Sequence, residues 1–228
     1  MKYRKVNYKS NWDWLIILDS ARYDFFAKLW DKTDVEPVLS IGSCTLEVLN
    51  NFPRLESSIC VTGHPFVLMH SKPFDKVWDV GFNYRLGTTP PWDVNLAVEL
   101  YIDEIRKYRR RVIWYLQPHY PFIGDTKFYI PIFEDKEKGV MPPQKRIEEL
   151  YKIAKLRGIL EKAYEDNLKL VLKFVDRLLR YLDGTVVITA DHGDGLGLPL
   201  RKEDKPVFAH PCERRELELR LIPWVVIR

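Results

Sequence analysis

The sequence predicts an α/β fold: a three-layer α/β/α sandwich around a mostly parallel central sheet, in a single domain that spans residues 1–228. Short apolar runs alternate along the chain with longer segments of helical periodicity, which is the pattern of βα units. Three of these runs, near residues 16, 113 and 187, are almost continuous in Ile, Val, Leu and Trp. Strands of this composition are buried on both faces, between layers of helices.

The strands follow from the apolar runs in chain order. We expect them at residues 14–18, 58–62, 76–80, 111–116, 185–190 and 223–227. Each run is short, and its isoleucines, valines and aromatic residues are the residue types that fit a half-buried or buried strand.

The helices are expected between these strands, at residues 21–30, 45–51, 92–109 and 147–182. The last has the clearest amphipathic period, with apolar side chains such as Leu168, Val171 and Leu172 on one face. Gly158 is expected to kink or break it, and Gly184 to end it. In segment 92–109 the apolar positions include Leu96, Val98, Leu100 and Ile105.

Residues 124–143 have a different character. They contain three prolines and a cluster of charged residues at 134–138, with apolar sheet segments on both sides. A long irregular segment inside a compact domain is usually functional, so we interpret it as a loop or lid that sets substrate specificity.

Composition limits the classes of function. The chain is 46% hydrophobic and 30% charged, as a globular protein is, and its net charge of +4 is too small to indicate nucleic-acid binding. We see neither a secretory signal nor an apolar run long enough to span a membrane. The scarcity of glutamine beside abundant Lys, Arg and Glu is typical of thermophiles.

The three cysteines, Cys44, Cys60 and Cys212, are too few and too scattered to predict a disulfide framework or a cysteine-based zinc site. Cys44 is interpreted as a plain buried thiol. A cytoplasmic location is the expectation that follows.

Two of the apolar runs end in residues that bind metals. Asp19 follows the first run, and Asp191 and His192 follow the run at 185–190. Active sites of α/β sheets form at the carboxyl ends of the strands, so these side chains are expected in one crevice. Two carboxylates and an imidazole suit one divalent ion, with Mn²⁺, Mg²⁺, Zn²⁺ and Ca²⁺ as the candidates. A hydroxyl beside such an ion loses its proton more readily.

Six segments carry residues typical of catalytic sites or of the strands beside them: 15–24 (LIILDSARYD), 40–46 (SIGSCTL), 117–122 (QPHYPF), 187–197 (VITADHGDGLG), 210–211 (HP) and 221–226 (LIPWVV). Taken together and in this order, they resemble the alkaline phosphatase superfamily and specifically its sulfatase-like branch. The resemblance extends from about residue 14 to residue 228, and the segment with Asp191 and His192 is its most specific part.

The resemblance implies a role for each matching residue. Asp19, Asp191 and His192 match the metal ligands, and Thr45 matches the nucleophile. His119 matches a histidine that contacts the substrate, and His210 a basic residue that helps to hold the oxyanion. Arg22 and Asp24 match a signature whose role we regard as structural or secondary.

The chain departs from the family pattern in ways that narrow the chemistry. The residues after Cys44 lack the pattern that precedes formylglycine, which argues against a formylglycine sulfatase. No Asp-x-x-x-His pair is present for a second ion, so a single-metal site is expected. The second acid of the sulfatase branch is replaced by Ser20, which leaves one ligand missing in this interpretation.

Each assignment has an ordinary structural alternative. Asp19 and Thr45 are also common at helix starts, and His119 and His210 are also compatible with packed or loop histidines. Three further residues carry secondary hypotheses: Ser43 as the alternative hydroxyl, His64 as a further side chain in the crevice, and Asp194 as a local cap.

The sequence therefore predicts a metal-dependent hydrolase or transferase of phosphate esters, with sulfate esters less favoured and Thr45 as nucleophile. The expected substrate is an anionic small molecule, a glycan or a lipid-headgroup ester. The alternative is a non-catalytic relative that binds an anionic ligand or partner. A nucleic-acid-binding protein is the least favoured hypothesis, because no recognition motif is present.

Overall fold

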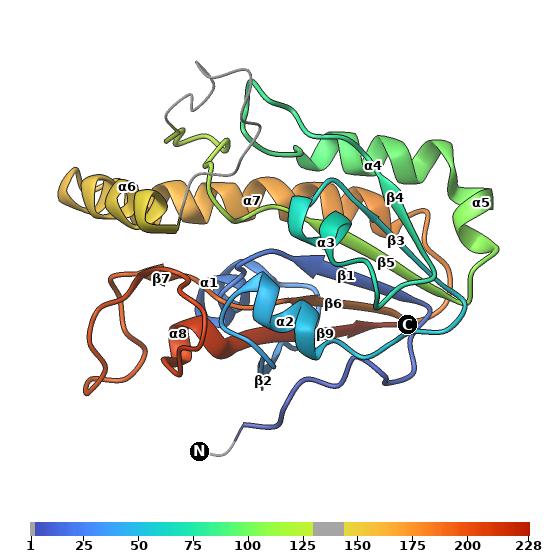
Figure 1. Cartoon of the computed structure of the whole chain (residues 1–228), viewed down its shortest axis with the longest axis horizontal. Helices are drawn as coiled ribbons and strands as arrows, with labels where there is room; N and C mark the ends of the chain where they lie inside the picture. Colours follow the sequence, from blue (N-terminus) through green and yellow to red (C-terminus); the bar gives the residue numbers. More distant parts are fainter. Residues whose placement is uncertain (1–2, 130–143) are drawn as a thin grey trace.

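The computed structural model describes residues 3–129 and 144–228. Its centre is a seven-stranded sheet with the order β2-β9-β6-β1-β5-β3-β4 (Figure 1). Five neighbouring strands, from β6 to β4, are parallel, whereas β9 is antiparallel to β6 and β2 is antiparallel to β9. The strands are β1 (Trp14–Leu18), β2 (Glu36–Leu39), β3 (Ser58–Thr62), β4 (Lys76–Asp79), β5 (Arg110–Tyr115), β6 (Val186–Ala190) and β9 (Leu221–Ile227), and a separate ribbon consists of β7 (Gly195–Leu196) and β8 (Phe208–Ala209).

Helices cover both faces of the sheet. The helices α1, α7 and α4 form one layer, in which α1 packs against β9, and α4 against β3 and β5. The helices α2 and α3 contact each other and are drawn in front of the sheet in Figure 1. The helices are α1 (Tyr23–Leu29), α2 (Thr45–Asn51), α3 (Pro65–Met69), α4 (Pro91–Leu100), α5 (Ile102–Arg106), α6 (Gln144–Leu156), α7 (Leu160–Leu179) and α8 (Leu217–Arg220). The predicted α/β sandwich with a mostly parallel sheet is therefore confirmed.

The continuous apolar runs became the centre of this sheet. Every residue of β1, β3 and β6 is buried. In the register of the sheet, Ile16 of β1 lies between Ile113 of β5 and Ile188 of β6. Apolar side chains on both faces of these strands explain why no polar alternation is visible in the sequence.

The two long helical segments each form two helices. Segment 147–182 breaks at Gly158, as predicted, where φ is +68° and a left-handed conformation ends α6. Segment 92–109 is interrupted at Tyr101, which leaves α4 and α5. Val98 is buried, whereas Leu96 is 54% and Leu100 66% exposed, so only part of the predicted apolar face of this segment reaches the core.

Some features were not predicted. The strand β2 contains Pro37 and lies at the edge of the sheet, the position where a proline in a strand is tolerated. The interpretation of Cys44 as a free thiol is wrong, because Cys44 and Cys212 form a disulfide across 168 residues of chain. Cys60 is free and buried.

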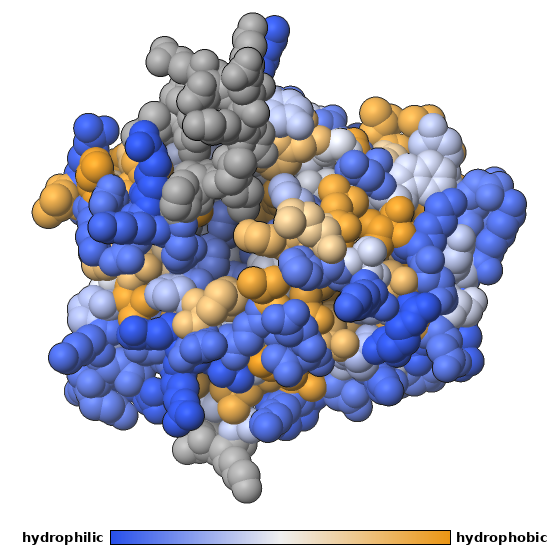
Figure 2. Space-filling model, in the orientation of Figure 1, coloured by the Kyte–Doolittle hydropathy of each residue, from blue (hydrophilic) through white to orange (hydrophobic). Residues whose placement is uncertain are grey.

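On the face shown in Figure 2 the described surface is mainly hydrophilic, with hydrophobic residues in groups among hydrophilic ones. Within residues 3–129 and 144–228, no helix has the length and apolar character needed to cross a bilayer. Of the predicted lid at 124–143, residues 130–143 lie outside the described part of the chain.

Candidate metal centre and nucleophile

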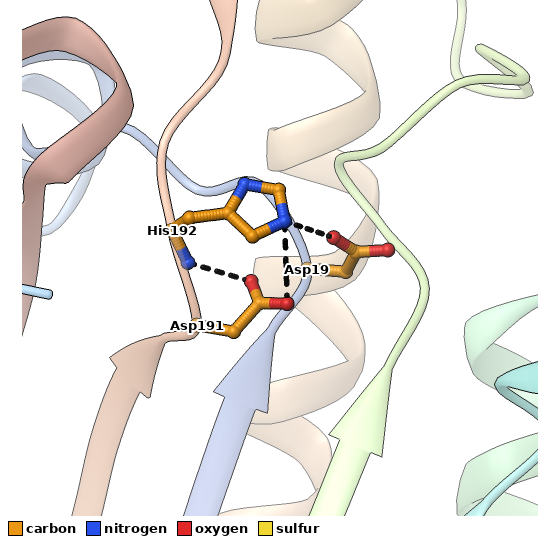
Figure 3. A group of neighbouring side chains, drawn as sticks. All are labelled: Asp19, Asp191 and His192. Carbon is orange, nitrogen blue, oxygen red and sulfur yellow. Dashed lines mark hydrogen bonds and ion pairs between the residues drawn. The ribbon is translucent and has the colours of Figure 1, made fainter. Parts of the chain in front are cut away.

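The three predicted metal ligands lie together at the carboxyl ends of two neighbouring strands. Asp19 follows β1, and Asp191 and His192 follow β6, with Leu18 and Ala190 paired in the last register position (Figure 3). One ligand atom from each residue lies within 4.8 Å of the other two, and all three side chains are buried. The parallel pairing of β1 with β6 thus joins residues that are far apart in sequence.

Backbone hydrogen bonds turn one ligand atom of Asp191 and one of His192 toward the cluster. Asp191 Oδ1 accepts from the backbone N–H groups of Ser20 (3.1 Å) and His192 (2.8 Å), whereas Oδ2 faces the Thr45 hydroxyl and His192 Nε2. His192 Nδ1 lies 2.7 Å from the carbonyl oxygen of Gly193, to which the ring donates its proton. Nε2 is therefore the atom available to a metal, and it lies 3.4 Å from Asp191 Oδ2 (Figure 3).

Asp19 is held in a similar way. Its Oδ2 lies 3.1 Å from His64 Nε2, whereas Oδ1 lies 3.5 Å from His192 Nε2 and accepts a bond of 3.0 Å from the Ser20 hydroxyl. Oδ1 is therefore the Asp19 oxygen that faces the other ligand atoms.

Burial sets the electrostatics of this cluster. Burial raises the pKa of Asp191, and the nearby His192 opposes that effect only in part. Burial also raises the pKa of Asp19, but the histidines at 119, 64 and 192 outweigh it, so this pKa lies below its ordinary value. The pKa of His192 is raised: burial lowers it, but both carboxylates more than compensate. Two carboxylates buried side by side require positive charge nearby, and a divalent cation would supply it.

Thr45 brings its hydroxyl to the same cluster. It is the first residue of α2, which begins where Cys44 leaves the extended conformation at φ −148°. Thr45 Oγ1 lies 2.9 Å from Asp191 Oδ2 and 3.1 Å from His192 Nε2. By contrast, the alternative hydroxyl, that of Ser43, contacts the carbonyl of Pro211 at 3.0 Å. The structure therefore brings Thr45 to two of the predicted metal ligands.

The two predicted substrate-contacting histidines also meet at this site. The rings of His119 and His210 have centroids 4.7 Å apart, and the centroid of His210 is 4.7 Å from that of His192. Burial lowers the pKa of His210 to about 4, although its contact with Asp194 raises it. His210 Nδ1 lies 3.3 Å from Asp194 Oδ1, so the neutral ring carries its proton there and Nε2 is left as an acceptor.

Asp194 does more than cap its own turn. Its Oδ1 accepts from the N–H of Gly195 at 3.0 Å, as a local cap would, but its Oδ2 accepts from Tyr151 Oη at 2.7 Å. All of these groups are buried. Asp194 therefore links α6 to His210, a link that no sequence pattern indicated.

Ser20, which the sequence suggested as the site of a missing ligand, instead donates hydrogen bonds to the carboxylates of Asp19 and Asp191. Its backbone has a left-handed φ of +65°, a conformation that costs free energy for a residue other than glycine. This conformation directs the Ser20 N–H to Asp191, while its hydroxyl bonds Asp19. Ser20 therefore supports the two carboxylates at the position where the sulfatase-like pattern has a second acid.

Two adjacent side chains of α7 fix the loop that carries His119. Asn167 donates to the carbonyl oxygens of Pro118 (3.0 Å) and His119 (3.2 Å). Asp166 accepts from the N–H (3.2 Å) and hydroxyl (2.7 Å) of Thr126. Burial raises the pKa of Asp166, but hydrogen bonds from a neighbouring lysine and from Thr126 leave it below its ordinary value.

Arg22 has the structural role that the sequence suggested. Its guanidinium makes two bonds with Asp24, at 2.8 and 2.9 Å, and donates to the carbonyl oxygens of Asp194 (3.3 Å) and Leu198 (3.2 Å). The side chain is 1% exposed. It ties the segment after β1 to the segment after β6, beside the metal ligands and not among them.

No protein-family model and no curated protein matches the chain. Solved structures do match it. The soluble domain of lipooligosaccharide phosphoethanolamine transferase A from Neisseria meningitidis is 13% identical, with a TM-score of 0.60, over 98% of this chain and 78% of that one. A protein from Bacteroides thetaiotaomicron assigned as a sulfatase is 13% identical, with a TM-score of 0.57, over 93% of this chain and 63% of that one.

The zinc complex of the C-terminal periplasmic domain of EptC from Escherichia coli is also similar, at 11% identity and a TM-score of 0.51, over 97% of this chain and 74% of that one. The chain spans 49% of the integral membrane form of the Neisseria meningitidis transferase. At these identities the likeness is one of fold.

Proposed function

Since the chain has the fold of the alkaline phosphatase superfamily, in the form found in its sulfatase-like branch, we propose that it transfers or hydrolyses phosphate esters with Thr45 as nucleophile. The position of Thr45 Oγ1, at 2.9 and 3.1 Å from two proposed metal-ligand atoms, carries this proposal. A hydroxyl so placed loses its proton readily once a cation is bound.

We propose zinc as the ion. Asp19 Oδ1, Asp191 Oδ2 and His192 Nε2 are single donor atoms, and the Thr45 hydroxyl is a fourth. Catalytic zinc sites commonly have three protein ligands and an open position, whereas Mg²⁺ and Ca²⁺ require six or more oxygen atoms. The zinc complex of the similar Escherichia coli domain supports this choice.

When bound, the ion would supply Lewis acidity toward a phosphate oxygen. In the proposed reaction Thr45 Oγ loses its proton and forms a bond to phosphorus, while the bond from phosphorus to the leaving oxygen breaks and that oxygen takes up a proton. An acceptor hydroxyl or water then attacks phosphorus, gives up its proton and releases Thr45, whose Oγ is protonated again.

His119 and His210 are proposed to contact the transferred group and to carry these protons. Nδ1 of His119 donates to the carbonyl of Tyr120 and Nδ1 of His210 to Asp194, so Nε2 of each ring is the nitrogen left to accept a proton. Groups that accept or release a proton at a reacting oxygen accelerate such steps.

The proposed substrate is a phosphate ester of a lipid headgroup or a glycan. It is supported by the name of one similar protein, a lipooligosaccharide phosphoethanolamine transferase. Sulfate esters are the less favoured substrates. The non-catalytic alternative rested on Ser20 and on the short chain, and the bonds of Ser20 to Asp19 and Asp191 weaken the first of these two grounds.

Location is a separate question. A cytoplasmic location and a thermophilic origin stay predictions. The disulfide between Cys44 and Cys212 is the observation that weighs against the cytoplasm, because disulfides persist mainly in oxidising compartments.

The experiment is hydrolysis of p-nitrophenyl phosphate, bis-p-nitrophenyl phosphate and p-nitrophenyl sulfate by the wild type and by Thr45→Ala, Thr45→Ser and Asp191→Asn, with and without zinc. We expect zinc-dependent turnover of a phosphate ester that falls on the order of 10³-fold or more in Thr45→Ala, while Thr45→Ser keeps part of it. Unchanged turnover in Thr45→Ala would refute the nucleophile. Zinc binding without any turnover would support the non-catalytic alternative.

A further inference from the structure

His64, for which the sequence suggested only a place in the crevice, is fixed beside the predicted metal ligands. Its side chain is 1% exposed and lies at the carboxyl end of β3, as the N-cap of α3. The nearest aromatic neighbours are Trp114, whose ring meets that of His64 edge-on at 6.2 Å, and Phe66 at 5.9 Å. The ring therefore has little freedom to turn.

The hydrogen bonds of His64 determine which nitrogen carries its proton. Nδ1 accepts from the backbone N–H of Phe66 at 3.1 Å, so it must have a free lone pair. The backbone N–H of His64 donates to Thr62 Oγ1 at 3.0 Å, which anchors the residue from the other side. A neutral imidazole with an acceptor at Nδ1 has its proton on Nε2. Nε2 points to Asp19 Oδ2 at 3.1 Å and donates to it.

This bond has a consequence for the metal ligand. With Oδ2 of Asp19 engaged by His64, the carboxylate is left with Oδ1 toward Asp191 and His192. A carboxylate held in this way acts as a ligand through one oxygen and in one orientation. Removing a side chain that hydrogen-bonds a metal ligand commonly lowers metal affinity by roughly 10- to 100-fold.

We infer that His64 is a positioning residue of the metal centre, which holds Asp19 by one oxygen so that the other binds the ion. The inference rests on the proposed function, because it needs the ion to bind at Asp19, Asp191 and His192. His64 in this role is not itself a ligand, and one ion per chain is expected.

Two substitutions separate the two nitrogens of the ring. The amide of Asn lies near the position of Nδ1, so His64→Asn keeps an acceptor for Phe66 and loses the donor to Asp19. The amide of Gln reaches the position of Nε2, so His64→Gln keeps a donor to Asp19 and weakens the cap. His70→Ala is the matched control, since His70 follows the same helix and has no part in the cluster.

The measurement is the zinc dissociation constant of the whole chain, by competition with a chromophoric chelator, together with zinc content per chain and the visible spectrum of the cobalt form. We expect a dissociation constant raised by about 10- to 100-fold in His64→Asn, restored to within a few-fold of wild type in His64→Gln, and unchanged in His70→Ala. The cobalt spectrum of His64→Asn should also differ from that of the wild type, because Asp19 is free to reorient.

Wild-type affinity in His64→Asn would overturn the inference and leave the proposed function standing. A second zinc ion that is lost in His64→Asn would also overturn it, because His64 would then be a ligand. If both His64 variants lost zinc affinity equally, and in proportion to their loss of folding stability without metal, the inference would also be overturned, because His64 would act only as a helix cap. A wild type that binds no zinc would instead refute the metal centre itself.

Discussion

Removing the disulfide should destabilise the protein strongly. Cys44 immediately precedes Thr45, and Cys212 lies two residues after His210, so the bond joins the two segments that bring these side chains to the site. The closed loop spans 168 residues. The chain-entropy relation for a loop of that length gives about 5 kcal/mol at 25 °C, and measured values for disulfides are more often about 2–4 kcal/mol. We therefore expect Cys44→Ala/Cys212→Ala to lower the free energy of unfolding by about 2–5 kcal/mol.

The assay is urea denaturation at 25 °C of the wild type, the double variant and the wild type held in reductant. Because the bond acts mainly on the unfolded chain, the reduced wild type should match the double variant, and the midpoint of thermal unfolding should fall by roughly 5–15 °C. Hydrogen bonds from Ser43 and to Glu47 also join the two segments, so the folded state should keep its secondary structure by circular dichroism. A loss below about 1 kcal/mol, or a loss in the double variant that reductant does not reproduce, would refute the reasoning.

The other predictions concern single side chains. Tyr151→Phe removes the donor to Asp194 and leaves a buried carboxylate oxygen unpaired, so the free energy of unfolding should fall by about 1–3 kcal/mol in urea titrations, and turnover should fall because His210 is less well held. Arg22→Met leaves two carbonyl oxygens without a donor at a site that is 1% exposed, which should cost about 3 kcal/mol in the same assay; a loss below 1 kcal/mol would contradict it. The pKa of Asp166 is lowered in the folded state, so the stability that this carboxylate contributes is complete above its unfolded pKa of about 3.9 and is lost as pH falls below that value. Asp166→Asn should therefore be less stable than the wild type at pH 7 and equally stable in acid. A stability difference that grows in acid would contradict this reasoning. Zinc at about 1,000 times its dissociation constant should stabilise the wild type by about 4 kcal/mol and Asp191→Asn far less, measured as the shift in thermal midpoint.

The sequence was most informative where a single physical cause dominated. The bounds of β1 and β3 were predicted to the residue, because buried parallel strands require continuous apolar runs. The break at Gly158 followed from the conformational freedom of glycine. The edge strand β2 was missed, because an edge strand needs few apolar side chains and its single partner, β9, is remote in sequence.

The candidate site shows the same division. Asp19, Asp191, His192 and Thr45 were named from the sequence, and their side chains lie together in the structure. The groups that hold them were not identified. The bond from His64 to Asp19, like the disulfide, depends on long-range packing and leaves no periodic signal in the chain.

The position of β1 within the sheet also determines when this protein can complete its fold during synthesis. Both strands that pair with β1 are made much later, and β2 finds its partner only in β9, which follows both of them. During synthesis β1 therefore stays unpaired until β5 has been made, and an intermediate that exposes this apolar strand is prone to aggregate or to need a chaperone. Because Asp19 follows β1 and Asp191 follows β6, the proposed metal site could form only after β6 has been made, so metal would bind late in folding.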